Sequence, residues 1–129
     1  MAAADLDSLL LDPTRLSIVS LLAATRWAEF GWVRESVGMS DSALSKQVTT
    51  LSKQDYVEVE KGYVGKRPRT WLNLSDAGRA ALESHVAALQ QIVEQSRQAG
   101  EVRDAGPDRG GNDSPARYSR RSSPPPAQA

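Results

Sequence analysis

Apolar residues recur every three or four positions through the first half of the chain, which is the period of an amphipathic helix. Asp12 and Pro13 suit the N-cap and the first turn of a helix that runs to about residue 24. The same spacing predicts a second helix over residues 30–37 and a third over about residues 41–54. The sequence therefore predicts three short helices in succession.

The period then falls to two residues, as expected for half-buried strands. Val57 and Val59 alternate with polar residues, and a second alternating run covers residues 70–74. The intervening residues include two glycines and Pro68. We therefore expect a hairpin in which a longer loop joins two short strands.

A long helical pattern follows the hairpin. Ser75 can cap this last helix, which we expect to run from Asp76 to about Arg97. A short additional helical turn is expected over residues 5–11. The order helix, helix, helix, hairpin, helix predicts an α+β, mainly helical domain over residues 5–98 with a long C-terminal helix.

The composition of the chain changes near Gln98. Residues 99–129 are rich in Gly, Pro, Ser and Arg, and such a segment buries too little apolar surface to offset the entropy of ordering it. The sequence therefore predicts a disordered tail. Arg117, Arg120 and Arg121 either add non-specific affinity for DNA or belong to an inert linker.

Charge and residue usage narrow the possible functions. Sixteen Lys and Arg balance sixteen Asp and Glu, so a basic surface must be local rather than global. The chain has no cysteine and one histidine, His85, which we interpret as a partly buried or interface side chain. The chain therefore lacks most of the residues that the common catalytic triads and Cys/His zinc sites require. We expect no enzymatic activity, no metal site and no cofactor.

The sequence also lacks the pattern of a membrane or secreted protein. No stretch approaches the roughly 18 consecutive apolar residues of a membrane span. The N-terminus shows neither the basic start nor the apolar run of a signal peptide. We therefore expect a cytoplasmic protein without membrane contact.

The third predicted helix has the two faces that a DNA-reading helix needs. One face carries the apolar residues Leu44, Val48 and Leu51. The opposite face carries Ser42, Ser45, Lys46, Thr49 and Lys53. Small hydroxyl side chains allow close approach to the groove floor, and a lysine can reach phosphates or guanine acceptors. An ordinary amphipathic helix with a solvated face shows the same pattern, so this helix alone does not decide the function.

The predicted hairpin favours DNA binding. Between Lys61 and Trp71 the sequence has four basic residues and no acid: Lys61, Lys66, Arg67 and Arg69. A basic loop with a glycine hinge can follow the phosphate backbone and insert an arginine into the minor groove. A solvated loop with chance charges is the alternative. The position of the loop just after a candidate recognition helix favours the interpretation that the hairpin is a DNA-binding wing.

Four segments in this order resemble a winged-helix family of bacterial regulators, the compact MarR- and ArsR-like proteins. They are residues 11–16, 42–48, 65–70 and 74–79, and the resemblance covers about residues 8–95. It implies a winged helix-turn-helix fold and a homodimeric transcriptional regulator, with double-stranded DNA as its partner. On the recognition helix it places Ser42, Ala43, Ser45, Lys46 and Thr49, and on the wing Lys66, Arg67 and Arg69. The cysteine-containing metal signature of many ArsR proteins is absent, so metal sensing is not implied.

The last helix is a candidate dimer interface. The first of two apolar stripes consists of Leu82, Val86, Leu89 and Val93, with a spacing suited to another helix. The second stripe consists of Ala81, Ala88 and Ile92. One stripe can pack on the domain and the other on a second subunit. Alternatively, both stripes pack into the core of the domain itself.

The sequence also suggests an effector pocket and a protein partner. Trp27 and Trp32 are most simply core or interface residues, but they are also candidates for a pocket that binds a small-molecule effector near the dimer interface. A winged helix can also bind an acidic protein instead of DNA. Sensitivity to salt discriminates these partners, because binding to phosphates releases counterions.

Overall fold

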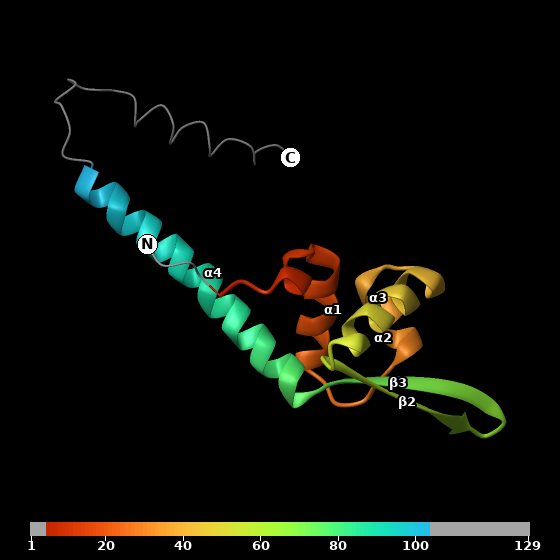
Figure 1. Ribbon diagram of the computed structural model, residues 1–129. Coiled ribbons are helices and arrows are strands. Elements are labelled where there is room, and N and C mark those ends of the chain that lie inside the picture. The colour runs from red at the N-terminus through yellow and green to blue at the C-terminus, as the bar shows by residue number, and fades with distance from the viewer. Residues whose placement is uncertain (1–4, 104–129) are drawn as a thin grey trace, which may run out of the picture. The chain divides into compact units, whose positions relative to one another are not determined.

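The computed structural model describes residues 5–103, and the elements up to Val93 form one compact unit. The elements, labelled in Figure 1, are η1 (Ser8–Leu11), α1 (Pro13–Ala23), β1 (Ala28–Glu29), α2 (Phe30–Val37), α3 (Asp41–Lys53), β2 (Val57–Val64), β3 (Arg67–Leu74) and α4 (Asp76–Arg103). The predicted order of helices and hairpin is confirmed.

Local capping explains where the short helices begin and end. The Asp12 carboxylate accepts a hydrogen bond from the backbone of Arg15, and Pro13 occupies the first turn of α1. Gly38 ends α2 in the left-handed conformation, with φ of 71°. The Ser40 hydroxyl accepts the Ala43 N–H and so begins α3.

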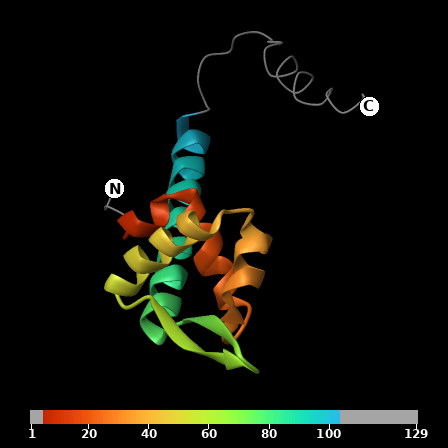
Figure 2. The same ribbon diagram turned by 90° about the vertical axis from the view of Figure 1, so that its right-hand side faces the viewer.

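The core lies between the short helices and one face of the sheet. Figures 1 and 2 show α1, α2 and α3 gathered on the same side of the hairpin. Among the fully buried residues are Leu10, Ile18, Leu22, Val33, Leu44, Leu51 and Leu72. The predicted apolar face of α3 therefore packs into the core, and its opposite face is left for solvent.

The sheet has three antiparallel strands in the order β1-β3-β2. The short strand β1 was not predicted, because two residues are too few to show a period. Its residue Glu29 pairs with Trp71, and Ala28 pairs with Leu72. This contact joins the start of α2 to the hairpin.

The prediction of a long hairpin loop is wrong. The ladder continues to the pair Val64 and Arg67, so only Gly65 and Lys66 connect the strands. Gly65 has φ of 66°, as tight hairpin turns require. The end of the hairpin is exposed on both faces, so its residues need not alternate between apolar and polar. The two-residue period vanishes there although the backbone pairing continues.

Helix α4 ends at Arg103, beyond the end expected near Arg97. No proline interrupts residues 98–103, and one glycine inside a helix costs only about 1 kcal/mol. The rest of the predicted tail, with Arg117, Arg120 and Arg121, lies outside the described residues. Within residues 5–103, no helix is long and apolar enough to cross a membrane.

Candidate nucleic-acid interface

The outer face of α3 carries the predicted recognition residues. Five of these side chains are exposed, namely Ser42, Ser45, Lys46, Thr49 and Lys53, whereas Ala43 is half-buried. Neither Lys46 nor Lys53 forms an ion pair with another of the described residues. The face therefore presents several small hydroxyls and two lysines that are unpaired within residues 5–103.

One of these hydroxyls already has a partner within the helix. Thr49 Oγ1 donates to the Ser45 carbonyl over 2.9 Å, which orients the threonine side chain. A bonded hydroxyl of this kind can still accept a hydrogen bond from a base edge, and its methyl group can contact thymine.

Two arginines set the position of α3. Arg15 of α1 donates to the Gln47 side chain over 3.1 Å and to the Leu9 carbonyl over 2.8 Å. Arg34 of α2 forms an ion pair with Asp41 over 2.7 Å, at the first residue of α3. The hydrogen bond with Asp41 and its charge raise the pKa of Arg34. Sequence reasoning missed both arginines, because their partners lie on other helices.

Strand alternation divides the basic residues of the hairpin between its two faces. Lys61 and Thr70 are a cross-strand pair, and both line the space beside α3. Successive residues of a strand point to opposite faces, so Arg67 and Arg69 belong to the other face. The exposed residues Lys66 and Arg67 stand at the turn.

Arg69 differs from the other predicted wing residues because it is already paired. Its Nε lies 2.9 Å from Oε2 of Glu29 in β1, and each side chain is 37% exposed. The pair links the hairpin to the strand that leads into α2. Glu29 was not identified from the sequence, because its partner is 40 positions away and no local pattern marks it.

Of the two predicted effector residues, Trp32 lines a surface depression that Trp27 does not line. Trp32 is 45% exposed and lines a depression of about 570 Å³ together with Arg34, Arg69 and Asp41. Trp27 is 39% exposed and is not among the residues that line this depression.

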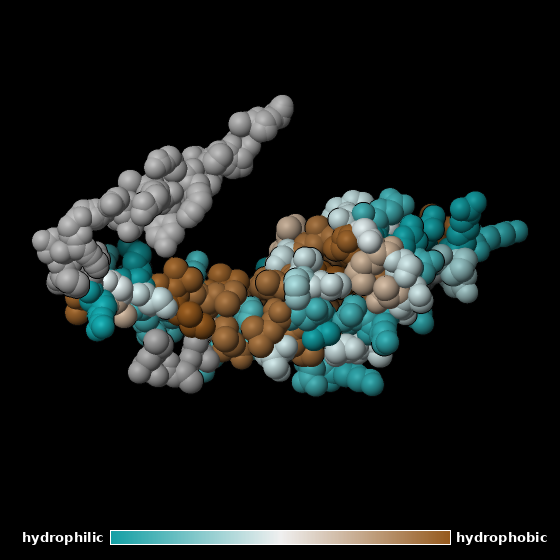
Figure 3. All heavy atoms as spheres, turned by 90° about the horizontal axis from the view of Figure 1, so that it is seen from above, coloured by the Kyte–Doolittle hydropathy of each residue, from teal (hydrophilic) through white to brown (hydrophobic). Residues whose placement is uncertain are grey.

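The first apolar stripe of α4 is largely exposed. Val86 and Leu89 are 38% and 37% exposed, Val93 is 65% exposed, and Leu82 is half-buried against the core. In the second stripe, Ala88 is buried, and Ala81 and Ile92 are half-buried. Figure 3 shows apolar residues gathered over α4 and the segment that precedes α1.

The described part of the chain shows no group that would suggest a metal centre. Residues 5–103 contain no cluster of three or more His, Cys, Asp or Glu side chains that could hold an ion. His85 is 1% exposed, and its Nδ1 accepts the backbone N–H of Asp7 over 2.9 Å. The histidine thus has a structural partner within the fold.

Comparison with known proteins connects this geometry to a family. A family model described as a winged helix DNA-binding domain matches residues 14–93. MJ0432 of Methanocaldococcus jannaschii, an uncharacterised protein, is 24% identical over 78 residues, which cover 60% of this chain and 85% of that protein.

Solved structures share the fold at low sequence identity. A transcriptional regulator homologue protein from Pyrococcus horikoshii OT3 has a TM-score of 0.64 and 22% identity, over 69% of this chain and 88% of that chain. MepR of S. aureus, in complex with DNA, has a TM-score of 0.58 and 9% identity, over 77% of this chain and 84% of that chain. The predicted winged helix-turn-helix fold is thereby confirmed. With its match over residues 14–93, the chain belongs to the winged helix DNA-binding domain family.

Proposed function

We propose that this protein is a homodimeric transcriptional repressor that binds specific sequences of double-stranded DNA. The observation that carries the proposal is the exposed polar face of α3, with Lys46 unpaired among the described residues, beside a hairpin that ends in Lys66 and Arg67. The major groove admits an α-helix, so α3 can present this face to base edges. Because the proposed target is chromosomal DNA, we expect the protein to act in the cytoplasm.

The proposed contacts fall into two kinds. Ser42, Ser45 and Thr49 face the bases, while Lys46 and Lys53 reach phosphates or guanine acceptors. Ala43, at the first turn of α3, allows the backbone to approach the groove. Lys66 and Arg67 contact the phosphate backbone of the DNA or enter its minor groove from the hairpin turn. Because Glu29 holds Arg69, we assign that arginine mainly to fixing the position of the hairpin.

The DNA complex of MepR supports this proposal, because that protein shares the fold and binds DNA. Two exposed side chains favour the alternative of an acidic protein partner: Tyr63 and Val64, which are 72% and 55% exposed near the hairpin turn. Apolar contacts of that kind suit a protein surface better than a phosphate backbone.

An effector site at Trp27 and Trp32 is also a proposal. Titration of the protein with aromatic compounds, followed by tryptophan fluorescence, tests it.

The decisive experiment measures the affinity of the full chain for duplexes from the flanks of its own gene. We expect sequence-selective binding that weakens by orders of magnitude between about 50 and about 200 mM salt. Lys46→Ala and Arg67→Ala should each weaken binding about tenfold and reduce the slope of log affinity against log salt by about one. Arg69→Ala should have a smaller effect on this slope.

Arg97→Ala provides the matched control, because Arg97 is an exposed arginine on α4 that pairs with Glu94. Its affinity and salt slope should equal those of the wild type. Salt-insensitive binding, or equal losses in Arg97→Ala and Arg67→Ala, would contradict the proposal. Folded protein that binds no duplex but captures an acidic protein would support the alternative.

A further inference from the structure

The outer part of the hairpin protrudes from the domain. Residues 63–68 are all exposed, whereas Gly62 and Arg69, which pair across the strands, are half-buried. This pair therefore marks the point at which the hairpin leaves the body of the domain. From here to the turn at Gly65 the arm is about 10 Å long, because a strand rises about 3.3 Å per residue.

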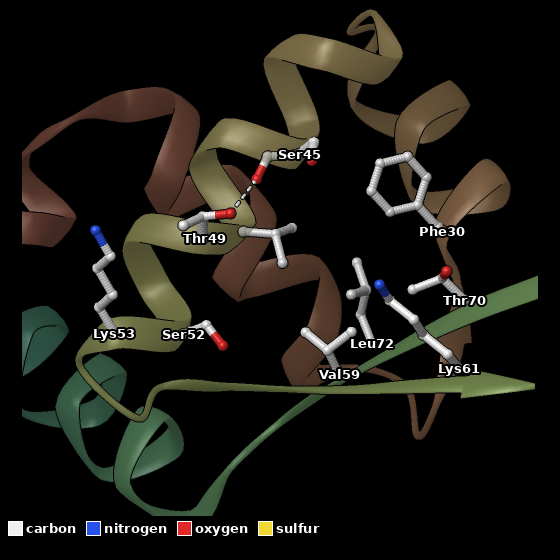
Figure 4. Close-up of a pocket in the computed structure, with 10 residues that line it drawn as sticks. Phe30, Ser45, Thr49, Ser52, Lys53, Val59, Lys61, Thr70 and Leu72 are labelled. Carbon is white, nitrogen blue, oxygen red and sulfur yellow. Dashed lines mark hydrogen bonds between the residues drawn. The ribbon is translucent and has the colours of Figure 1, made fainter.

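The two faces of the hairpin carry different side chains at this point. Figure 4 shows Lys61 and Thr70 on the face toward α3. Alternation along each strand places Gly62, Arg69 and Trp71 on the opposite, outer face. The contacts of the outer face are therefore separate from those of the recognition face.

The ring of Trp71 lies against the backbone of β2 at Gly62. A Cβ atom at Gly62 would lie 3.3 Å from Cζ3 of the Trp71 ring. The ladder pairs Trp71 with Glu60, so the ring leans two residues along β2 toward the turn. A larger side chain at position 62 would displace the ring, since carbon atoms in favourable contact lie about 3.5–4.0 Å apart.

The side chain of Arg69 leans in the opposite direction, toward the body of the domain. Its guanidinium reaches Glu29 of β1 over 2.9 Å, and Glu29 pairs with Trp71 in the sheet. The arginine thus connects the protruding part of the hairpin to the strand that leads into α2. The Trp71 ring on Gly62 and this ion pair together hold the hairpin on its outer face, at the point where it leaves the domain.

We propose that Trp71 is a positioning residue, which fixes the angle of the hairpin and thereby places Lys66 and Arg67 on DNA. With an arm of about 10 Å, a rotation of about 10° at the pair of Gly62 and Arg69 moves the turn by roughly 2 Å. Hydrogen bonds vary in length by only about 0.5 Å, so such a shift weakens the contacts made from the turn. The effect of Trp71 on binding rests on the proposed function, whereas its control of the hairpin angle does not.

The first test measures the position of the turn without DNA. Because the chain has no cysteine, nitroxide labels can be attached at Val64→Cys on the hairpin and Ser20→Cys on α1, both exposed positions. Labelled chains are diluted with unlabelled ones, so that only distances within one chain contribute. Trp71→Leu should shift or broaden the distance distribution by about 2 Å. Trp71→Phe, which keeps a flat ring, should retain most of the wild-type distribution.

The second test is a double-mutant cycle on duplex binding by the full chain. In the wild type, Arg67→Ala should weaken binding about tenfold. In Trp71→Leu the same change should weaken binding by no more than about threefold, because Arg67 has already lost its position. Lys46→Ala is the matched control, since Lys46 lies on α3 and away from the outer face. Its loss should be about tenfold in both backgrounds.

Gly62→Val tests the same contact from the other strand. Valine displaces the Trp71 ring but favours a strand more than glycine does, so the hairpin should still form. The variant should show both the shifted label distance and the reduced effect of Arg67→Ala. It carries the test if Trp71→Leu does not fold, which circular dichroism determines.

The outcomes separate the positioning role from the proposed function. An unchanged label distance in both Trp71→Leu and Gly62→Val would overturn the positioning role. Equal reductions of the Arg67→Ala and Lys46→Ala effects would also contradict it, because they indicate a general loss of the binding surface. A changed distance with an undiminished effect of Arg67→Ala would support control of the hairpin angle and refute its consequence for binding. A changed distance in a protein that binds no duplex would overturn the proposed function and leave control of the angle supported.

Discussion

Asp7, Tyr56 and His85 connect three parts of the fold through single side chains. The Tyr56 hydroxyl donates to the Asp7 carboxylate, and the Asp7 backbone N–H donates to His85 Nδ1 over 2.9 Å. The hydrogen bond with Asp7, together with burial and the negative charge of Asp7, raises the pKa of Tyr56 to about 12. These bonds attach the segment before η1 to both α4 and the start of β2.

The bond between Tyr56 and Asp7 predicts a loss of stability at alkaline pH. Tyr56→Phe should lower the free energy of unfolding by about 1 kcal/mol at a pH of about 8. An unfolded tyrosine has a pKa of about 10, so the contribution is present below about pH 10. It is lost as the pH rises through the folded value of about 12. Urea denaturation at several pH values measures the difference between the two proteins.

Tyr63→Phe is the control, because Tyr63 is 72% exposed and should contribute little to stability. The wild type and this variant should unfold alike at a pH of about 8. A difference between wild type and Tyr56→Phe that stays constant up to a pH of about 11.5 would contradict the assigned cause.

Among the elements, α4 makes its closest approach to the hairpin in its first turn. Ser75 caps the helix by accepting the Gly78 N–H over 2.9 Å, and its own N–H donates to the Tyr56 carbonyl. A Cβ atom at Gly78 would lie 2.3 Å from that carbonyl oxygen and 2.6 Å from Cδ1 of Leu74. The helix therefore packs on the hairpin at a distance that only glycine permits.

Gly78→Ala should consequently destabilise the protein by at least about 2 kcal/mol, because backbone must move to admit the methyl group. Gly100 is a matched glycine in the same helix, with nothing within 4 Å of a Cβ atom at that position. Gly100→Ala should be neutral or stabilise by up to about 1 kcal/mol through helix propensity. Urea denaturation compares the two variants, and similar effects would refute the close packing.

For the molecule as a whole, the exposed stripe of α4 raises the question of assembly. Val86 and Leu89 lie on the outer side of a helix whose Ala88 and His85 are buried. The domain's own core thus uses the second stripe and leaves much of the first to solvent. Near the N-terminus, before α1, Leu6 and Leu11 are 37% and 55% exposed. A second copy of the chain would remove this apolar surface from water.

The homodimer that we propose gives a direct prediction. The double variant Val86→Glu with Leu89→Glu should be monomeric in sedimentation experiments, since burying two unpaired carboxylates costs several kcal/mol. Its affinity for a two-site duplex should fall more than its affinity for a half-site. Gln90→Glu, which adds a charge at an exposed position of the same helix, should remain dimeric. A wild-type chain that sediments as a monomer would contradict the proposal.

Much of the fold was predictable because its determinants are local. Asp12, Gly38 and Ser75 mark helix ends through bonds within a single turn, and their effects do not depend on distant residues. The apolar face of α3 likewise follows from the spacing of Leu44 and Leu51. Periodicity and capping therefore identified α1 to α4 and the existence of the hairpin.

The predictions failed for segments that show no local pattern of apolar residues. Strand β1 has two residues, and the outer hairpin is exposed on both faces, so neither shows an apolar period. The exposure of Lys46 could be anticipated from helix geometry. The pairing of Arg69 with Glu29 could not, because the charge of an arginine does not specify its partner.

The sequence by itself determined the order of the elements, the caps of the helices and the basic character of the hairpin. The tertiary structure decided that Asp7 meets His85, that Glu29 holds Arg69, and that Lys61 extends into the space beside α3. The physical reason is the separation along the chain over which each kind of interaction acts. Backbone hydrogen bonds and residue periods act within a few positions of the chain, whereas these contacts join residues that only the packing of the elements brings together.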